Sequence, residues 1–317
     1  MPETVWDRIV QDAAAPIFYR SRFLRALAQH PLYETLDSTF VVLSQSEQAV
    51  GVLPVYQVGR LSPITKAPAA LNGDVWVSHL PHWYDSRWPS ILSPDELVDS
   101  MPTILAKAGV RDLVLQNVGS VPLLDALRRA GFQLIESDIR YVADLRNIPG
   151  PLEWPERLGS STRRNVRRAV RRAELAGWHR TIEPLESADL EAVIELCRRS
   201  SSRHGNPEWL PAGATAGFLQ ALGASASVVH EVRDHLGALV AAAVGFHDGS
   251  TYHSWSGGVS AHVDPAIDAN LLLHVSEYEY ALRHACSRLE GGRRSDELKQ
   301  RLGMAPVQLY TIVVAAN

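Results

Sequence analysis

Hydrophobic residues recur along this chain at two spacings, one typical of amphipathic helices and the other of half-buried strands. Phe23 and Leu27 lie four residues apart and predict a helix across residues 19–27. Apolar runs at residues 39–43 and 49–55 flank a polar turn, which is the pattern of a β-hairpin. Helix-type and strand-type segments then alternate to the end of the chain, and this order predicts a mixed α/β fold.

The rest of the first half follows from the same patterns. We expect helices at residues 95–108 and 122–130 and strands at residues 112–117 and 140–145. Residues 61–93 are rich in Pro and Trp and too irregular for one element, so we interpret them as a loop that faces the substrate or the domain boundary.

In the second half, two longer strands meet at Asp248 and Gly249, residue types typical of a two-residue hairpin turn. Asp264 and Pro265 are residue types typical of an N-cap and a first helical position, so we expect a helix to begin there. The other predicted elements are helices at 163–176, 187–203 and 296–302, a loop with a short helix at 206–223, and strands at 178–185, 227–233, 288–290 and 307–314.

A domain boundary is predicted at residues 147–151, where the sequence N-I-P-G-P breaks both helix and strand. Proline lacks a backbone donor and disfavours helix in the residue before it. The chain has 317 residues, which is about twice a typical domain length. We therefore expect two domains, residues 1–149 and residues 150–317.

Composition sets limits on the class of protein. Hydrophobic residues make up 46% and charged residues 21%, as in ordinary globular proteins, and the formal charge of −4 argues against a globally basic nucleic-acid binder. The N-terminal residues show no export signal and no apolar run is long enough to span a membrane, so we expect a cytoplasmic protein. Cys197 and Cys286 lack metal-ligand spacing and are expected to be free, buried thiols.

Positive charge is concentrated in one predicted helix. Its apolar stripe consists of Val166, Ala169, Val170 and Ala173, and Ser or Thr at its start and Gly177 at its end are plausible caps. Six arginines flank the stripe within ten residues, namely Arg163, Arg164, Arg167, Arg168, Arg171 and Arg172. Guanidinium groups bind phosphate through bidentate, charge-assisted hydrogen bonds, so we expect this helix to contact phosphate in RNA or in a small molecule.

The alternative for these arginines is a helix face that is merely solvated. Arginine runs are usually of that kind. The helix contains only one acidic residue, Glu174, which leaves most of the charge without a partner inside it. Both interpretations stay open at this point.

A second basic segment lies near the C-terminus. A strand ends in Gly291 and Gly292, which allow close approach of a ligand to the backbone, and Arg294 and Lys299 follow. The alternative is an ordinary turn from strand to helix with exposed basic side chains.

These motifs carry a resemblance to a known family. The run S-S-T-R-R-N-V-R-R-A, a helix at residues 189–203 and the pattern G-G-x(6)-K-x(3)-G-M-A-P occur here in that order. Together they resemble the Fem-type branch of the GNAT superfamily, which contains aminoacyl-tRNA-dependent peptidyltransferases. Residues 18–24 and the loop at residues 78–85 are similar to actinobacterial members, so the resemblance covers nearly the whole chain.

The resemblance implies two tandem GNAT-like domains, an acceptor side in residues 1–149 and a donor side in residues 150–317. It implies transfer of an activated acyl group to an amine, with aminoacyl-tRNA as co-substrate and with no metal or other cofactor. Members include cell-wall peptide-bridge enzymes and the tRNA-dependent alanyltransferase of pacidamycin-type antibiotics. Lys299 matches the lysine expected near the reacting centre, where it stabilises an oxyanion or binds the terminal tRNA phosphate.

The donor is the least determined part of this prediction. Acetyl-CoA enzymes of the superfamily bind pyrophosphate on backbone N–H groups where the central helix begins. Asp264 and Pro265 would place a negative charge and a missing donor there, which favours tRNA over acetyl-CoA.

Further candidates surround the expected centre. The strand at residues 251–256 places His253, the candidate general base, beside Trp255 on one face. The candidate acyl and acceptor pocket consists of Tyr252, Trp255, His204, Trp209, His82, Trp83 and Tyr84. An individual histidine or a Pro-Trp loop also commonly has only a structural role.

Three functions stay open. The first is an aminoacyl-tRNA-dependent transferase that forms an amide with a peptide or peptidyl natural-product acceptor. The second is an N-acyltransferase with an acyl-CoA or carrier-protein thioester donor, and the third is a non-catalytic RNA- or nucleotide-binding protein.

Overall fold

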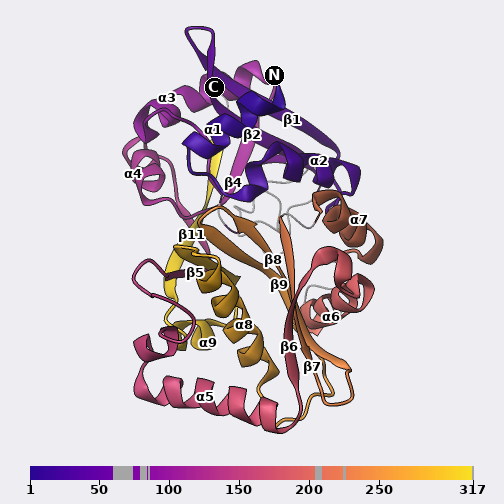
Figure 1. Ribbon diagram of the computed structural model, residues 1–317. Coiled ribbons are helices and arrows are strands. Elements are labelled where there is room, and N and C mark those ends of the chain that lie inside the picture. The colour runs from indigo at the N-terminus through magenta and orange to yellow at the C-terminus, as the bar shows by residue number, and fades with distance from the viewer. Residues whose placement is uncertain (60–73, 79–83, 85, 204–208, 224–225, 316–317) are drawn as a thin grey trace. The chain divides into compact units, whose positions relative to one another are not determined.

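The computed structural model describes residues 1–59, 74–78, 84, 86–203, 209–223 and 226–315 (Figure 1). The chain divides into two compact units. Unit 1 contains Met1–Arg25, Tyr33–Ile139 and Val307–Asn317, and unit 2 contains Ala26–Leu32 and Arg140–Pro306. The last strand of the chain is thus part of unit 1, although the residues before it belong to unit 2.

Unit 1 holds a five-stranded sheet in the order β1-β2-β3-β4-β11. Only β3 and β4 are parallel, and the other neighbours are antiparallel. Helix α1 packs on β2, and α3 packs on α4. Its elements are α1 (Glu3–Asp12), η1 (Ile17–Tyr19), α2 (Ser21–Gln29), β1 (Asp37–Gln45), β2 (Gln48–Val58), β3 (Val75–Val77), α3 (Pro94–Lys107), β4 (Asp112–Val118), α4 (Val121–Arg129) and β11 (Ala305–Ala315).

Unit 2 holds a six-stranded sheet in the order β5-β10-β9-β8-β7-β6, in which only β9 and β10 are parallel. Helices α8 and α5 lie on one face and α6 on the other (Figure 1). Its elements are β5 (Ile135–Asp144), η2 (Trp154–Arg157), α5 (Ser160–Leu175), β6 (His179–Pro184), η3 (Leu185–Ser187), α6 (Leu190–Arg203), α7 (Ala212–Leu222), β7 (Ser227–Arg233), β8 (Leu239–Asp248), β9 (Thr251–Val259), α8 (Ala269–Arg283), β10 (Arg288–Arg293) and α9 (Asp296–Arg301).

The mixed α/β class and both hairpins are confirmed. The turn between β8 and β9 is Gly249–Ser250, with Gly249 at a φ of 58° that favours glycine. Helix α1 and the short strand β3 were not predicted, because α1 has a short apolar face and β3 lies inside the Pro- and Trp-rich segment.

The predicted start of the central helix at Asp264 and Pro265 is wrong. These two residues lie in a turn, and α8 begins at Ala269. Asp268 is its N-cap, and the Asp268 side chain accepts a hydrogen bond of 3.0 Å from the Leu271 amide. Asp264 and Asp268 are both residue types that can cap a helix. Only Asp268 is followed directly by an uninterrupted helix.

Strand β9 contains a β-bulge. Ser254 and Ser256 pair with the adjacent residues Gly245 and Val244 of β8, so Trp255 is an extra residue in β9. Over these described strands, β9 pairs with β10 only at Thr251–His253, opposite Arg288–Glu290. The two parallel strands therefore separate immediately after His253.

Helix α6 approaches β9 very closely at Gly258. A Cβ atom on Gly258 would lie 2.3 Å from the carbonyl oxygen and 2.6 Å from the carbonyl carbon of Leu196, both backbone atoms of α6. Because Gly258 has no side chain, α6 can pack directly on this face of the sheet.

We predict that Gly258→Ala lowers the free energy of unfolding by about 1–3 kcal/mol, because the backbone of α6 has to shift. Urea unfolding measures this difference. Gly213→Ala in α7 is the matched control, since no atom lies within 4 Å of its added Cβ; it should keep or raise stability. Equal losses of unfolding free energy in Gly258→Ala and Gly213→Ala would contradict the close approach of α6 to Gly258.

Candidate functional site

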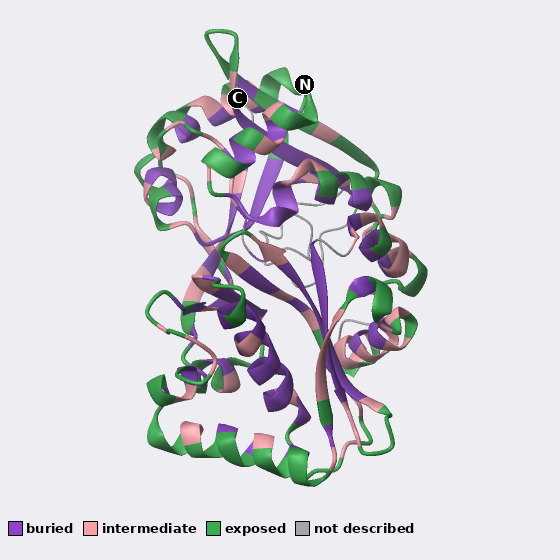
Figure 2. Ribbon diagram, in the orientation of Figure 1, coloured by how far each residue is buried: buried purple, intermediate pink, exposed green. Residues whose placement is uncertain are grey.

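Helix α5 is confirmed as an amphipathic, arginine-rich helix. Val166, Ala169 and Ala173 are buried, and α5 packs on α8. Trp154 of the preceding η2 stacks on Tyr278 of α8 with ring centroids 4.0 Å apart, which anchors the start of α5. Most of the helix length is otherwise exposed (Figure 2).

The arginines of α5 divide into two groups. Arg163 and Arg167 both form ion pairs with Glu156 of η2, an acidic residue that lies outside the helix itself. Within the described part of the chain, Arg164, Arg168, Arg171 and Arg172 form no ion pair. The predicted Ser or Thr cap is wrong, because the N-cap is Gly159 and no side chain bonds there.

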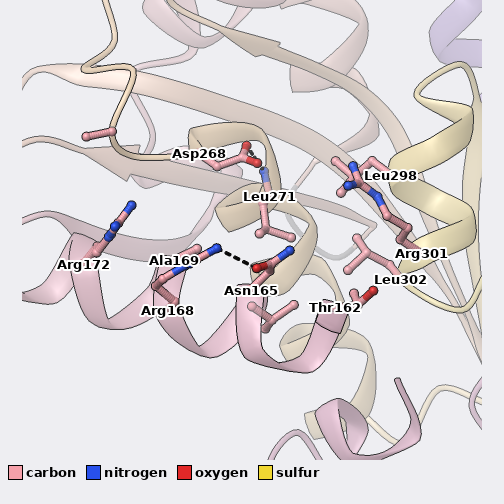
Figure 3. Close-up of a pocket in the computed structure, with 12 residues that line it drawn as sticks. Thr162, Asn165, Arg168, Ala169, Arg172, Asp268, Leu271, Leu298, Arg301 and Leu302 are labelled. Atoms are coloured by element: carbon pink, nitrogen blue, oxygen red, sulfur yellow. Dashed lines mark hydrogen bonds between the residues drawn. The ribbon is translucent and has the colours of Figure 1, made fainter. Parts of the chain in front are cut away.

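A pocket of about 190 Å³ opens between α5, the start of α8 and α9 (Figure 3). Arg168 and Arg172 of α5 and Arg301 of α9 line it, together with Asp268. Its lining also includes polar Thr162 and Asn165 and the apolar residues Val166, Ala169, Ala266, Leu271, Leu298 and Leu302. A water molecule occupies about 30 Å³ in the liquid, so the pocket is large enough for a small anion such as phosphate.

The charges in this pocket favour recognition of an anion by guanidinium groups. Arg168 is oriented by a hydrogen bond of 2.7 Å to Asn165 (Figure 3). The first turn of α8 is less available to an anion, because the Asp268 carboxylate takes the Leu271 N–H and adds a negative charge there. Arg301 and Asp268 lie far in sequence from α5, and no local pattern indicated that they would meet it.

Lys299 is buried on α9. Its ammonium group donates a hydrogen bond of 2.7 Å to the carbonyl of Arg293 and lies 5.9 Å from the centroid of the Tyr141 ring. Gly291 is closely packed, since a Cβ there would lie 2.4 Å from the Met304 sulfur. Arg294 is exposed with a φ of 68° at the turn before α9.

The predicted residues of β9 are all buried but do not form one cluster. His253 is 2% exposed and lies opposite Phe246 in the β8–β9 register. Trp255 contacts Phe246 and Phe218, with centroids 5.2 and 5.9 Å apart. The Tyr252 hydroxyl instead bonds to His230 on the α8 side of the sheet at 2.8 Å.

The other predicted pocket residues are distributed over both units. Tyr84 is buried in unit 1 and packs edge-on against Phe18, with centroids 5.3 Å apart. Trp209 is partly exposed in unit 2. His82, Trp83 and His204 lie outside the described residues.

Beneath α8 lies a buried polar network that the sequence patterns did not indicate. His230 of β7 bonds through Nδ1 to Ser276 at 2.9 Å and through Nε2 to Tyr252 at 2.8 Å. Glu277 bonds through its two oxygens to Ser254 at 2.5 Å and His274 at 2.9 Å. A sequence pattern that could have indicated part of this network is the spacing of His274 and Glu277, three positions apart on a predicted helix.

Burial and hydrogen bonding shift the pKa values of this network. Burial lowers the pKa of His230 to about 4, although the nearby Glu277 charge opposes the shift. Burial alone would raise the pKa of Glu277, but its bonds to His274 and Ser254 and the neighbouring histidines lower it below its ordinary value. Glu277 is therefore a carboxylate at neutral pH.

Two other kinds of feature, a metal site and a membrane-spanning helix, are absent from the described residues. No group of three or more His, Cys, Asp or Glu side chains there is arranged to hold a metal ion. None of the described helices is long and apolar enough to cross a membrane.

Comparison with known families places the second half of the chain. Residues 160–300 match the family model described as the acetyltransferase (GNAT) domain. This part of the chain, somewhat less than half of its 317 residues, is thus similar to GNAT domains. The bulged β9, its separation from β10 and the helix α8 between them all lie within it.

Solved structures extend the likeness of the GNAT domain to the whole chain. FemX aligns with a TM-score of 0.69 at 12% identity, covering 99% of this chain and 96% of FemX. L-PGS from Bacillus licheniformis aligns with a TM-score of 0.62 at 10% identity, covering 98% of this chain and 91% of L-PGS. No curated protein matches the sequence. The Fem-type GNAT fold expected from the motifs is confirmed.

His230 makes a testable contribution to the pH dependence of stability. Its folded-state pKa of about 4 lies below the ordinary 6.5, so only the unfolded state binds a proton between these values, and stability falls as the pH drops through this range. The expected loss between pH 7 and pH 4.5 is about 2–2.5 kcal/mol. Chemical denaturation of the wild type and His230→Gln at pH 7 and pH 4.5 measures it. The unfolding free energy of His230→Gln should change less between the two pH values than that of the wild type. Equal changes in the two proteins would contradict a neutral, buried His230.

Proposed function

We propose that this protein transfers the aminoacyl group of an aminoacyl-tRNA to the amine of a peptide or peptidyl natural-product acceptor and so forms an amide bond. The GNAT domain and the Fem-type fold support acyl transfer. The choice of tRNA as donor is supported chiefly by one observation: Arg168 and Arg172 of α5, which have no acidic partner among the residues that the structure describes, line the pocket together with Arg301.

A nucleic-acid donor fits the shape and charge of α5. The helix is 16 residues long and therefore extends about 24 Å, which is several times the distance between neighbouring phosphates in a nucleic-acid strand. Arg164, Arg168, Arg171 and Arg172 are exposed along it. A small thioester donor would use one end of such a surface, whereas an RNA backbone would use its length.

The start of α8 supports the same choice. An acyl-CoA donor would place its pyrophosphate against free N–H groups of the helix N-terminus. Asp268 occupies this position with a carboxylate and takes one of the N–H groups. The negative charge that was expected from Asp264 at the start of this helix is thus supplied by Asp268.

In the proposed reaction, the acceptor amine attacks the aminoacyl ester and a tetrahedral oxyanion forms. Lys299 is proposed to supply positive charge near the end of β10, either to this oxyanion or to the terminal tRNA phosphate. His253 stays a candidate base, and Tyr252, Trp255, Trp209 and Tyr84 stay candidates for the acyl and acceptor pockets. No resident cofactor is required by this chemistry.

The donor class is tested by incubating the protein with candidate peptide amines and either labelled aminoacyl-tRNA or labelled acyl-CoA. We expect amide product from aminoacyl-tRNA and its loss when the tRNA is digested with ribonuclease beforehand. Product from acyl-CoA that is insensitive to ribonuclease would replace this proposal with a thioester-dependent acyltransferase. Binding of RNA without product from either donor would favour a non-catalytic role.

We predict that Arg168→Ala combined with Arg172→Ala weakens tRNA binding and reduces the slope of log K against log salt by about 2, because fewer counterions are released. Fluorescence anisotropy at several salt concentrations measures both quantities. Arg198→Ala combined with Arg199→Ala removes the same charge from α6, where both arginines pair with Glu195. An unchanged slope in the α5 variant would assign its arginines to a solvated surface.

A further inference from the structure

His274 has the surroundings of a proton-transfer group. Its Nδ1 lies 2.9 Å from Glu277 Oε2, and the other oxygen of Glu277 accepts a hydrogen bond of 2.5 Å from Ser254. Glu277 is 1% exposed, whereas the His274 side chain keeps 10% exposure. A buried carboxylate thus holds one nitrogen of an imidazole that solvent still reaches.

The protonation of this pair follows from the charge of Glu277. Because Glu277 is a carboxylate at neutral pH, its oxygen accepts the bond and His274 Nδ1 carries the proton. This arrangement leaves the lone pair on His274 Nε2. A carboxylate behind an imidazole fixes the tautomer and also stabilises the imidazolium that forms when Nε2 takes a proton.

The topology places His274 over the part of the sheet where β9 and β10 have separated. The last paired residue of β9 is His253, and Ser254, which bonds to Glu277, is the next residue. Helix α8 connects two parallel strands and must run antiparallel to both. His274 precedes Glu277 by one turn, about 4.5 Å of helix rise, and therefore lies farther toward the end of β9 than Ser254 does.

Two other buried histidines of this domain, His230 and His253, are less suited to the role. His230 is fully buried and both of its nitrogens have hydrogen-bond partners, Ser276 and Tyr252. His253 is 2% exposed and lies on the side of the sheet where Phe246 and Trp255 pack. His274 combines a fixed tautomer, remaining exposure and a position beside the separated strands.

We propose that His274 is the general base of the transfer reaction, with Glu277 as its positioning residue. His274 Nε2 removes a proton from the attacking amine as the new C–N bond forms. When the ester C–O bond breaks, the imidazolium returns this proton to the ribose hydroxyl that leaves. Protons and electrons balance without another reactant.

This assignment rests on the proposed aminoacyl transfer, and its kinetic test uses the full-length protein. We expect His274→Gln to lower kcat by about 100-fold or more, as is typical when a general base is lost, with KM for both substrates nearly unchanged. Added imidazole should restore part of the activity of His274→Ala. A kcat for His274→Gln within threefold of the wild type would overturn the proposal.

Two further variants separate catalysis from structure. His284 is the C-cap of α8 and lies ten residues, or about 15 Å of helix rise, beyond His274. His284→Gln should therefore keep the wild-type kcat. His253→Gln compares the alternative base directly, and a larger loss of kcat there than in His274→Gln would overturn the proposal. Thermal unfolding of each variant shows whether it is folded.

An additional measurement does not depend on the donor. Nitrogen-15 NMR of labelled histidine reports the tautomer of each ring, and we expect the proton of His274 on Nδ1, with a change in Glu277→Gln. A proton on Nε2 would overturn the assignment of His274. Absence of transfer from aminoacyl-tRNA in the wild type would instead refute the proposed function, and the tautomer would still decide whether His274 is set up as a base.

Discussion

The short pairing between β9 and β10 is the constraint on which the arrangement of the GNAT domain depends. Two parallel strands that stay paired leave no room between them, whereas these are joined over only three residues. The bulge at Trp255 bends β9 just beyond the last pair, and α8 must then cross the separated region. The carboxylate, the imidazole and the serine hydroxyl beneath α8 meet because of this geometry.

The arginine helix shows how one element can serve packing and charge together. Three small apolar residues are sufficient to bury one side of α5 against α8, and the Trp154 ring stacked on Tyr278 secures its start. Glu156 neutralises the arginines on one side, while those that face the pocket keep their charge. The helix is thus rigid where it packs and charged where a ligand can reach it.

Local patterns were sufficient to predict most elements, since hairpins and amphipathic helices depend on neighbouring residues. The position of β11 in unit 1 could not be predicted, because an apolar strand pairs equally well with several edges. The arginines of α5 were recognised from their density in the sequence. Arg301 and Asp268 were not, since their place in the pocket depends on how α8 and α9 pack on α5.

The Asp268 cap has a consequence for anion binding at the start of α8. A helix N-terminus without a carboxylate presents N–H groups to any small anion, and the carboxylate turns the same position into one that repels phosphate. The cap of α8 and the proposed discrimination against a pyrophosphate-bearing donor thus involve the same side chain. Replacement of Asp268 by a residue without a carboxylate would remove the cap, at a cost of about 1 kcal/mol, and would leave the Leu271 N–H and the positive end of the α8 dipole open to an anion.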